Sequence, residues 1–369
     1  MKKWIACGLI CLLFCGCTPD LNRNEIGNVA FIRLMGIDRR EGRFRLTAAF
    51  SQQRSKEDSP EADYVKAEGD SIFQAYEALK VKYDKPITFA NTNYFLLGED
   101  AARYGLEQCT DFITRDETAK LDALLFVVKD REAEGFIEEA SKDGTILSQR
   151  LEDRSGKLLF ASTKKEHTLR SVMDMLDNPY AAPLLPALEL KEGDLLICGY
   201  AVFQDLKLQD YADLQRSYGI DFWKNNVRSM PLTVEGNTGL VISQSETKLK
   251  TRVRDGRLYV NATVTFSSNI KEADMVQDVF SPDGLNAMTQ RQNQAVYQLM
   301  QETAEYAKAQ QNDVLQLSKT LLTQHPKEWD MVKEQWPSAL SDAVIEISVG
   351  SKIAHTFDIE RQAKGGGNS

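Results

Sequence analysis

The chain has 369 residues, with 45 Lys or Arg and 54 Asp or Glu, so its formal net charge is −9. Hydrophobic residues make up 42% and charged residues 27%, a balance typical of a folded globular body rather than a disordered chain or a multi-span membrane protein. The acidic balance gives no electrostatic case for nucleic-acid binding. The length exceeds one ordinary core and predicts two or three domains.

The first seventeen residues have the pattern of an export signal. Two lysines precede an uncharged run over 4–16, which is too short to span a bilayer as a helix. Gly16 stands directly before Cys17, and the stretch resembles a lipobox, in which the cysteine thiol is lipidated and the chain is cleaved in front of it, although Phe14 stands where Leu is usual. We therefore predict a signal peptide over 1–16 and lipidation at Cys17. An ordinary cleaved signal and a retained hydrophobic anchor are the alternatives.

Residues 17–150 are predicted to form an N-terminal α/β domain, because strands alternate with helices along them. NVAFIRLMGID and RLTAAF predict two strands around a turn, with Phe44, Leu46, Ala48 and Phe50 on one face of a sheet. The elements expected next are a loop over 53–63, a helix with Ile72, Ala75, Tyr76 and Leu79 on one side, a buried strand in TNYFLLG, a helix from Asp100 to Thr114, a strand over 122–128 and a helix in EAEGFIEEA.

Residues 151–240 are predicted to form a middle domain. Helices and loops are expected up to PYAAPLLP, whose three prolines require an extended or turned backbone. LLICGYAVFQDLKLQDY then predicts a β-hairpin, and a short helix is expected before SYGIDFWKNN ends.

Residues 241–362 are predicted to form a C-terminal α/β domain, followed by a loose tail over 363–369. GLVISQSETKLKTRVR and RLYVNATVTF predict two paired strands, each with one buried and one wet face. The elements expected after them are a helical stretch from Asn286 to Leu322 with a bend near Asn312, a short helix with Trp329, Val332 and Trp336 that Pro337 stops, and an edge strand in AVIEISVGSKI that buries Ile345, Ile347 and Val349. The fold class predicted is α+β, with mixed or antiparallel sheets.

A search for catalytic, cofactor-binding or metal-binding residues finds none. His167, His325 and His355 lie far apart in the sequence and lack metal-ligand spacing, so each is expected to be structural, with His325 capping a helix. There is no glycine-rich phosphate loop, no nucleophile elbow and no catalytic cysteine–histidine pair. We therefore predict no enzyme activity and no cofactor.

Three other sets of residues allow two interpretations each. Cys109 and Cys198 are expected to be separate buried thiols, and a single disulfide is the alternative. Trp329 and Trp336 are expected to pack in the core, and an exposed docking patch is the alternative. Lys248, Lys250, Arg252 and Arg254 alternate along one strand and are expected on a wet face, or else on a patch that meets an anionic lipid surface or an acidic partner.

Several stretches together resemble one family, the Ger(x)C spore germination lipoproteins, which are the C subunits of germinant receptors. The stretches that carry the resemblance, in the order of the family, are LNRNEI with MGID, FANTNYFLLGEDAARYGLEQCTDFITRDETAKLDALLFVVKD, LLPALEL with GYAVFQDLKLQDY, and NDVLQLSKTLLTQHPKEWDMVKEQWPSALSDAVIEISVGSKI. They cover nearly the whole chain after the signal. Thr18, Pro19 and Asp20 stand where the family usually has a Trp-Asp pair after the lipid cysteine.

The resemblance implies an elongated body of three α/β domains, anchored by lipid to the outer face of the spore inner membrane. It also implies two integral membrane partners, the A and B subunits, and a role in nutrient-triggered germination without catalysis. A solute-binding lipoprotein of a transporter is the alternative, and it would require a deep polar cleft between two similar lobes. An envelope hydrolase is disfavoured because the sequence has no nucleophile or metal signature.

Overall fold

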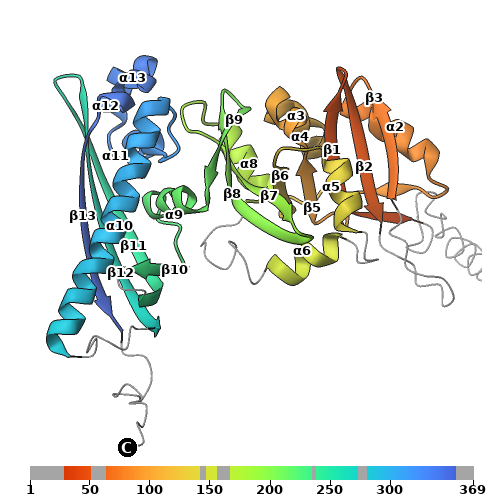
Figure 1. Ribbon diagram of the computed structural model, residues 1–369. Helices are drawn as coiled ribbons and strands as arrows, with labels where there is room; N and C mark the ends of the chain where they lie inside the picture. The colour runs from red at the N-terminus through yellow and green to blue at the C-terminus, as the bar shows by residue number, and fades with distance from the viewer. Residues whose placement is uncertain are drawn as a thin grey trace, which may run out of the picture.

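The computed structural model describes residues 29–50, 64–141, 147–155, 167–234, 238–272 and 281–354. The predicted signal peptide, Cys17, the predicted loop over 53–63, His355 and the predicted tail lie outside the described residues. Figure 1 shows an elongated arrangement with one sheet at each end and helix α9 between them. Both sheets contain parallel and antiparallel pairs, which confirms the predicted α+β class with mixed sheets.

The first sheet has nine strands, in the order β3-β2-β1-β5-β6-β7-β8-β9, with β4 paired to β1. The strands are β1 (Ala30–Arg40), β2 (Arg43–Phe50), β3 (Tyr64–Gly69), β4 (Ile87–Thr88), β5 (Tyr94–Leu97), β6 (Leu124–Val128), β7 (Leu184–Lys191), β8 (Asp194–Gln204) and β9 (Lys207–Asp213). Strands β1, β5, β6 and β7 are parallel neighbours, and antiparallel strands extend the sheet on both sides.

Helices cover both faces of the first sheet. Apolar side chains from α2 (Ile72–Lys82), α3 (Glu99–Tyr104), α4 (Leu106–Arg115) and α8 (Leu169–Leu176) pack into the core on one face. Those from α5 (Ala133–Ala140) and α6 (Leu147–Ser155) pack on the other face. Successive residues of the short central strands are therefore both buried, as in Tyr94–Leu97, which explains why the predicted strand TNYFLLG is an unbroken apolar run.

The residues predicted to lie on the buried faces of β2 and α2 are confirmed. Phe44, Leu46, Ala48 and Phe50 of β2 share one core, and the buried residues of α2 are the predicted set of Ile72, Ala75, Tyr76 and Leu79. The predicted single helix from Asp100 to Thr114 is wrong, because the chain breaks at Gly105 into α3 and α4. The amide of Leu106 donates at 2.7 Å to the carbonyl of Leu206 in the β8–β9 turn, so α4 starts afresh against that turn.

Asp38, the last residue of the MGID stretch, holds α5 against the first sheet. Its carboxylate accepts hydrogen bonds from the amides of Ala133 at 2.7 Å and Glu134 at 2.9 Å, which satisfies the otherwise unpaired amides of the first turn of α5. Asp38 is 1% exposed, and burial raises its pKa to about 6 although these backbone hydrogen bonds act to lower it. A side chain at Gly98 would collide with this carboxylate, because its Cβ would lie 1.9 Å from Oδ1.

The second sheet has four strands in the order β10-β11-β12-β13. The strands are β10 (Ser229–Val234), β11 (Thr238–Arg254), β12 (Arg257–Glu272) and β13 (Val344–Ile353). The long β11–β12 hairpin turns at Asp255 and Gly256, as predicted, and β13 adds to β12 in parallel. Leu258, Val260, Ala262, Val264 and Phe266 are buried as predicted, whereas Ile345, Ile347 and Val349 of the edge strand are only partly buried.

Five helices lie on the buried face of the second sheet. They are α9 (Leu214–Trp223), α10 (Pro282–Gln310), α11 (Leu317–Gln324), α12 (Pro326–Val332) and α13 (Trp336–Ser341). The predicted bend near Asn312 is a full break, because Asp313 accepts hydrogen bonds from the first amides of α11 at 2.9 and 2.8 Å. The prediction that Pro337 stops a helix is wrong. Pro337 stands in the first turn of α13, where the amide that proline lacks would have had no helical partner.

Neither predicted boundary between domains coincides with the division between the two sheets. The boundary at 150/151 does not separate two sheets, because β6 and β7 pair across it at Val127–Ala187 and Val128–Leu188. The boundary at 240/241 lies inside β11. The sheets divide the described residues into two bodies, one ending with β9 and the other starting after α9, and the division into three domains stays a prediction.

Candidate functional site

A cavity of about 400 Å³ lies where the two bodies meet. One wall comes from α8 and the segment after it, and includes Asp174 and Tyr180. The opposite wall comes from the end of α9 and from α11 and α12, and includes Lys224, Lys319 and Trp329. The site is therefore built by both bodies.

Two buried polar side chains, His167 and Asn226, line this cavity and are 5% and 4% exposed. His167 Nε2 lies 3.3 Å from the hydroxyl of Tyr200, which donates to Asp221 Oδ1 at 2.9 Å. Asn226 Nδ2 donates to the same oxygen at 3.0 Å. These residues come from the start of α8, from β8, from α9 and from the loop after α9, so one polar network joins the first sheet to the helix between the bodies.

Burial sets the charges of this network. Burial raises the pKa of Asp221 to about 6 and that of Tyr200 well above its ordinary value. Burial, together with the positive charge of Lys224, lowers the pKa of His167 to about 3. At neutral pH the network therefore holds a neutral imidazole and an ionised carboxylate. Because Tyr200 is 1% exposed and its hydroxyl is hydrogen-bonded on both sides, this hydroxyl is not an accessible nucleophile.

Backbone and side-chain contacts fix the two bodies beside the cavity. The amide of Ala182 donates to the carbonyl of Asp313 at 3.1 Å, and Asn312 Nδ2 donates to the carbonyl of Phe203 at 3.1 Å. The rings of Tyr180 and Trp329 meet edge to face with centroids 4.8 Å apart. These contacts make the back of the cavity a packed junction.

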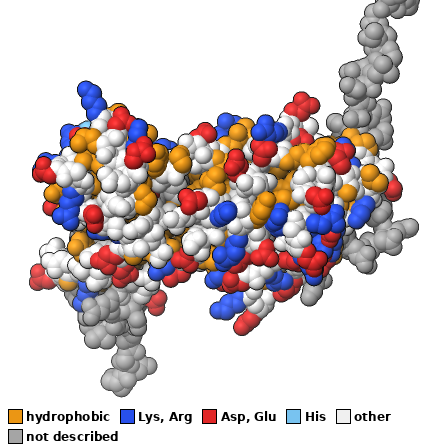
Figure 2. Space-filling view, turned by 90° about the horizontal axis from the view of Figure 1, so that it is seen from above, with side chains coloured by type: hydrophobic (Ala, Val, Ile, Leu, Met, Phe, Trp, Pro, Cys, Tyr) orange, Lys and Arg blue, Asp and Glu red, His pale blue; other side chains and the backbone are white. Residues whose placement is uncertain are grey.

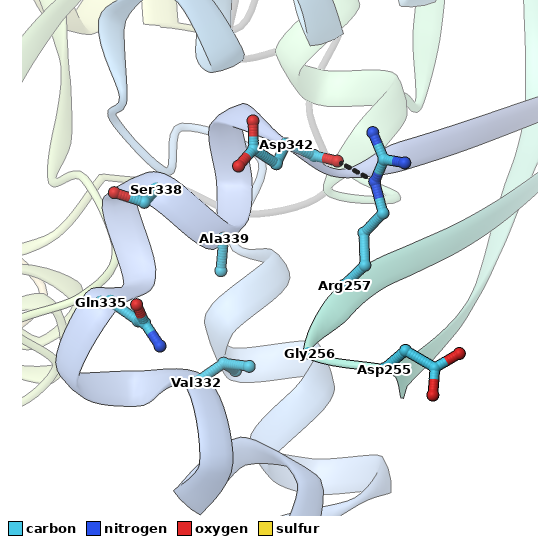
Figure 3. A pocket seen from close by; sticks show the side chains of 8 residues that line it. All are labelled: Asp255, Gly256, Arg257, Val332, Gln335, Ser338, Ala339 and Asp342. Atoms are coloured by element: carbon cyan, nitrogen blue, oxygen red, sulfur yellow. Dashed lines mark hydrogen bonds between the residues drawn. The ribbon is translucent and has the colours of Figure 1, made fainter.

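A second cavity, of about 420 Å³, lies between the β11–β12 turn and α13. Figure 3 shows Arg257 reaching from the start of β12 toward the end of α13, where its Nε donates to the carbonyl of Asp342 at 2.9 Å. Val332 and Ala339 are the apolar side chains of a lining that is otherwise mostly polar or charged. The hydrogen bond between Arg257 and Asp342 closes the end of the sheet against the helices. The lining residues of this cavity include no histidine or cysteine.

The predicted cationic residues of β11 all lie on the exposed face of the second sheet. Lys248 pairs with Glu246 at 3.4 Å, and Arg252 pairs with Glu328 at 3.3 Å and contacts His325. The expectation of a wet sheet face is confirmed. Over the side of the molecule seen in Figure 2, acidic and basic side chains are interspersed.

The remaining residues singled out by sequence are structural. Trp329 and Trp336 are 5% and 2% exposed and pack edge to face at 5.0 Å, which confirms the core interpretation over the docking patch. Cys109 and Cys198 are both free, so the disulfide alternative is wrong. Cys109 is buried as expected, whereas Cys198 is only partly buried, and burial raises their thiol pKa values to about 12 and about 11. His325 stands at the N-cap of α12, but its side chain makes no cap hydrogen bond there.

Within the described ranges, no group of three or more His, Cys, Asp or Glu side chains is arranged to hold a metal ion. In the same part of the chain, no helix is both long enough and apolar enough to cross a membrane. Sequence reasoning missed Asp38, Tyr200 and Asp221, whose carboxylates and hydroxyl are fully buried. A weak signal for two of them was present in the sequence, because MGID places Asp38 and CGY places Tyr200 inside strongly apolar strands, whereas Asp221 lies in α9.

Two sequence models of one protein family match the chain in tandem. The model described as "Spore germination protein N-terminal domain" matches residues 22–190, and the model described as "Spore germination B3/ GerAC like, C-terminal" matches residues 198–357. Together they cover most of the chain, and the gap between them, 191–197, contains the turn between β7 and β8. The chain therefore belongs to the Ger(x)C family of spore germination proteins, as its sequence indicated.

Curated relatives match over almost their full length. Spore germination protein KC of Bacillus subtilis (strain 168) is 21% identical, with 91% of each chain covered. Spore germination protein B3 of the same strain is 22% identical, with 93% of this chain and 94% of the relative covered. The putative spore germination protein YfkR is 21% identical, with 92% of each chain covered.

The crystal structure of the GerBC protein has the same fold. Its TM-score to this chain is 0.60 at 16% identity, with 87% of this chain and 97% of that chain covered. The likeness extends over both sheets, because so much of the chain is included. These comparisons do not favour the alternative of a transporter's solute-binding lipoprotein.

Proposed function

We propose that this protein is the lipid-anchored C subunit of a spore germinant receptor and is needed for nutrient-triggered germination. The observation that carries the proposal is the tandem match of both germination family models over residues 22–190 and 198–357. The partners proposed are the integral membrane A and B subunits of the receptor. The location proposed is the outer face of the spore inner membrane.

The N-terminal sequence supports the membrane attachment. The short apolar run over 4–16 ends at Gly16 and Cys17, which resembles a lipobox. Each buried methylene of an acyl chain contributes about 0.8 kcal/mol, and two or more chains hold a protein stably where one does not. A diacylated and N-acylated Cys17 is therefore a sufficient anchor for a chain of this size.

The described residues support a role in assembly rather than in catalysis. The buried network of His167, Tyr200 and Asp221 is held by hydrogen bonds within the protein. Cys109 and Cys198, the two cysteines among the described residues, have raised thiol pKa values, which disfavours the reactive thiolate. A subunit that binds partners needs a rigid body with presented surfaces, and two sheets joined by a packed junction provide one.

The anchor is tested by the variant Cys17→Ala. We expect the variant in a soluble fraction or as an uncleaved precursor, whereas the parent chain sediments with membranes. Cys109→Ala is the matched control, because Cys109 is a buried thiol of the folded body. Normal processing and membrane retention of Cys17→Ala would show that lipidation at this residue is wrong.

The role in germination is tested by deleting the gene, or the segment from Asn312 to Ile353, in a strain that lacks other nutrient receptors. Removing this segment exposes the core of the second sheet, so that body should collapse. We expect normal growth and sporulation, strongly slowed germination with nutrients, and unchanged germination with agents that bypass nutrient receptors. Normal nutrient germination in this strain would exclude the proposal.

A further inference from the structure

The outer edge of the second sheet is open. β13 is the last strand of this sheet, and within the described ranges no strand pairs with its other side. Figure 1 shows β13 on the side of the second body that faces away from the first body. Its pairing with β12 runs from Val344 to Ile353 without a register shift, so the edge is regular along its whole length. A regular, unpaired edge is a template for another strand.

The backbone groups on this edge belong to the odd-numbered residues of β13. In a parallel pair, the amide and carbonyl of one residue point to the partner strand, and those of the next residue point away. The amide of Ala354 donates to the carbonyl of Ser268 in β12 at 2.8 Å, which fixes this alternation. Ile345, Ile347 and Val349 therefore turn their amides and carbonyls toward the open edge, where an added strand can pair with them.

The apolar side chains beside the edge are incompletely covered. Ile345, Ile347 and Val349 pack against the core of the second sheet but are only partly buried, whereas their register partners in β12 are fully buried. The difference follows from position, because β12 has a strand on each side and β13 has a described neighbour on one side only. An added strand would cover these side chains as well as pairing the backbone.

A groove of about 370 Å³ runs between this edge and α10. Just before the strand, Lys308 Nζ donates to the carbonyl of Ala343 at 2.7 Å. Near the end of the strand, Gln292 Nε2 donates to Ser351 Oγ at 2.6 Å, so α10 runs antiparallel to β13. Tyr297 lies between these two contacts, lines the groove and is 36% exposed. The helix thus leaves the edge accessible and adds an aromatic side chain beside it.

The opposite edge of the same sheet is protected. β10 has six residues and contains Pro231, which has no amide to donate to another strand. β13 has ten residues, no proline, and no bulge in its pairing with β12. Edges that are not interfaces are usually short or interrupted, so β13 has the features of an edge that pairs with another chain.

The charges of β13 identify the strand that fits it. Its exposed side chains include one acid, Glu346, and one base, Lys352, three residues on either side of Val349. If two β13 strands pair antiparallel about Val349, Glu346 of each copy lies directly opposite Lys352 of the other. In this register odd-numbered residues lie opposite odd-numbered residues, as the backbone groups on the edge require. Opposite charges in directly facing positions stabilise an antiparallel pair, so β13 is complementary to itself.

We propose that two copies of this protein pair through β13, with the strands antiparallel and the two-fold axis at Val349. The two four-stranded sheets then form one continuous sheet, with the helices of both copies on the same face. Ile345 of each copy is covered by Ile353 of the second copy, and Tyr297 lies close to the interface. Because β13 faces away from the first body, the two first bodies lie at opposite ends of the dimer.

The test measures the mass of the full-length chain, purified in detergent, by analytical ultracentrifugation with the bound detergent subtracted. We expect a monomer–dimer equilibrium. Lys352→Glu places like charges opposite each other twice, so it should raise the dissociation constant of the dimer at least about tenfold. The double variant Glu346→Lys with Lys352→Glu exchanges the charges and should restore the dimer. Lys250→Glu is the matched control, because Lys250 is an exposed lysine of β11, away from the edge.

Cysteine cross-linking tests the register. Val349→Cys should form a disulfide between two copies under mild oxidation, because the residues at the two-fold axis face each other. Ile345→Cys is the matched control, since this residue has the same orientation and partial burial but lies away from the axis. The parent chain gives the background from Cys109 and Cys198. Circular dichroism of each variant checks its fold, and the exposed charge variants test the proposal even if a cysteine variant fails to fold.

Four outcomes would overturn the proposal. They are a chain that stays monomeric up to about 100 μM, a dimer that Lys352→Glu leaves unchanged, cross-linking through Ile345→Cys in place of Val349→Cys, and cross-linking of Val349→Cys in native membranes to a different protein only. The last outcome would assign this edge to that protein.

The proposal does not rest on the receptor role. A chain that supports germination but stays monomeric would refute this inference alone. A chain that pairs through β13 but is dispensable for nutrient germination would refute the receptor role alone.

Discussion

The two sheets of this protein differ in how many of their faces are buried. The nine-stranded sheet has an apolar core on each face, whereas the four-stranded sheet has helices on one face and charged strand residues on the other. The spacing of apolar residues along the strands reflects this difference. β5 and β6 are continuous apolar runs, and β12 alternates residue by residue from Arg257 to Phe266. The first sheet is thus enclosed, and the second is the body with a sheet surface open to partners.

Truncation of neighbouring strand residues is the strongest test of this difference. In β5, Leu96 and Leu97 are both fully buried but face opposite cores, so Leu96→Ala and Leu97→Ala should each lower the free energy of unfolding by about 2–5 kcal/mol. In β12, Val264→Ala should cost about 2 kcal/mol and Thr263→Ala at most about 0.5 kcal/mol. Denaturant unfolding followed by circular dichroism gives the four values. Equal costs at Val264 and Thr263 would mean that the outer face of the second sheet is covered.

The junction between the sheets is tested by Asp221→Asn. The pKa of Asp221 is raised from 3.8 to about 6 by burial, so folding favours its protonated form. This contribution to stability is complete below pH 3.8 and is lost as the pH rises through about 6. The neutral amide lacks this dependence, so the variant should gain on the order of 2–3 kcal/mol relative to the parent between pH 4 and pH 7.

The matched control for Asp221→Asn is Asp122→Asn, at an exposed carboxyl of the first body. We expect Asp122→Asn to change the free energy of unfolding by at most about 0.5 kcal/mol, because its side chain is exposed. A flat profile for Asp221→Asn would show that water reaches the network and that the junction is open.

The smallest expected changes in stability come from breaking one ion pair in each body. Burial acts to raise the pKa of Glu134, but hydrogen bonds from Lys66 and Arg45 keep it below its ordinary value. Because Glu134 is 15% exposed, Glu134→Gln should cost about 1–2 kcal/mol at neutral pH, and this cost should be lost as the pH falls below the carboxyl range. Glu246→Gln breaks a pair whose side chains are 55% and 70% exposed, so it should cost at most about 0.5 kcal/mol. Thermal unfolding at low and high salt distinguishes the two, and a larger effect at Glu246 would contradict the comparison.

Local patterns predicted most of the elements, because each depends on residues close together in the sequence. The apolar face of α2, the β11–β12 hairpin and the buried side of β12 follow from spacing alone. The errors occurred where a distant contact decides the structure. Helix α4 restarts because Leu106 meets the turn after β8, and β6 pairs with β7 although a helix-containing segment separates them.

The candidate site was not predictable in the same way. His167, Tyr200, Asp221 and Asn226 are unremarkable singly, and they form a network only because α9 packs between the two sheets. The cavity charges likewise come from three helices, and no spacing in the sequence relates Asp174 to Lys319. Pro337 shows a different limit, since proline both ends helices and starts them, and here it lies in the first turn of α13, next to the buried Trp336.

The parallel pairing of β13 with β12 has a consequence for the order in which the chain folds. All of α10 to α13 lies between these two strands, so the pairing closes a long loop, which is entropically slow. The β11–β12 hairpin can form early from neighbouring residues, but the edge of β12 stays unpaired until almost the whole chain has been synthesised. The nine-stranded sheet is complete long before that point. We therefore expect the first body to be native while the second still exposes a strand edge, and this late intermediate is the state in which the protein is most prone to aggregate.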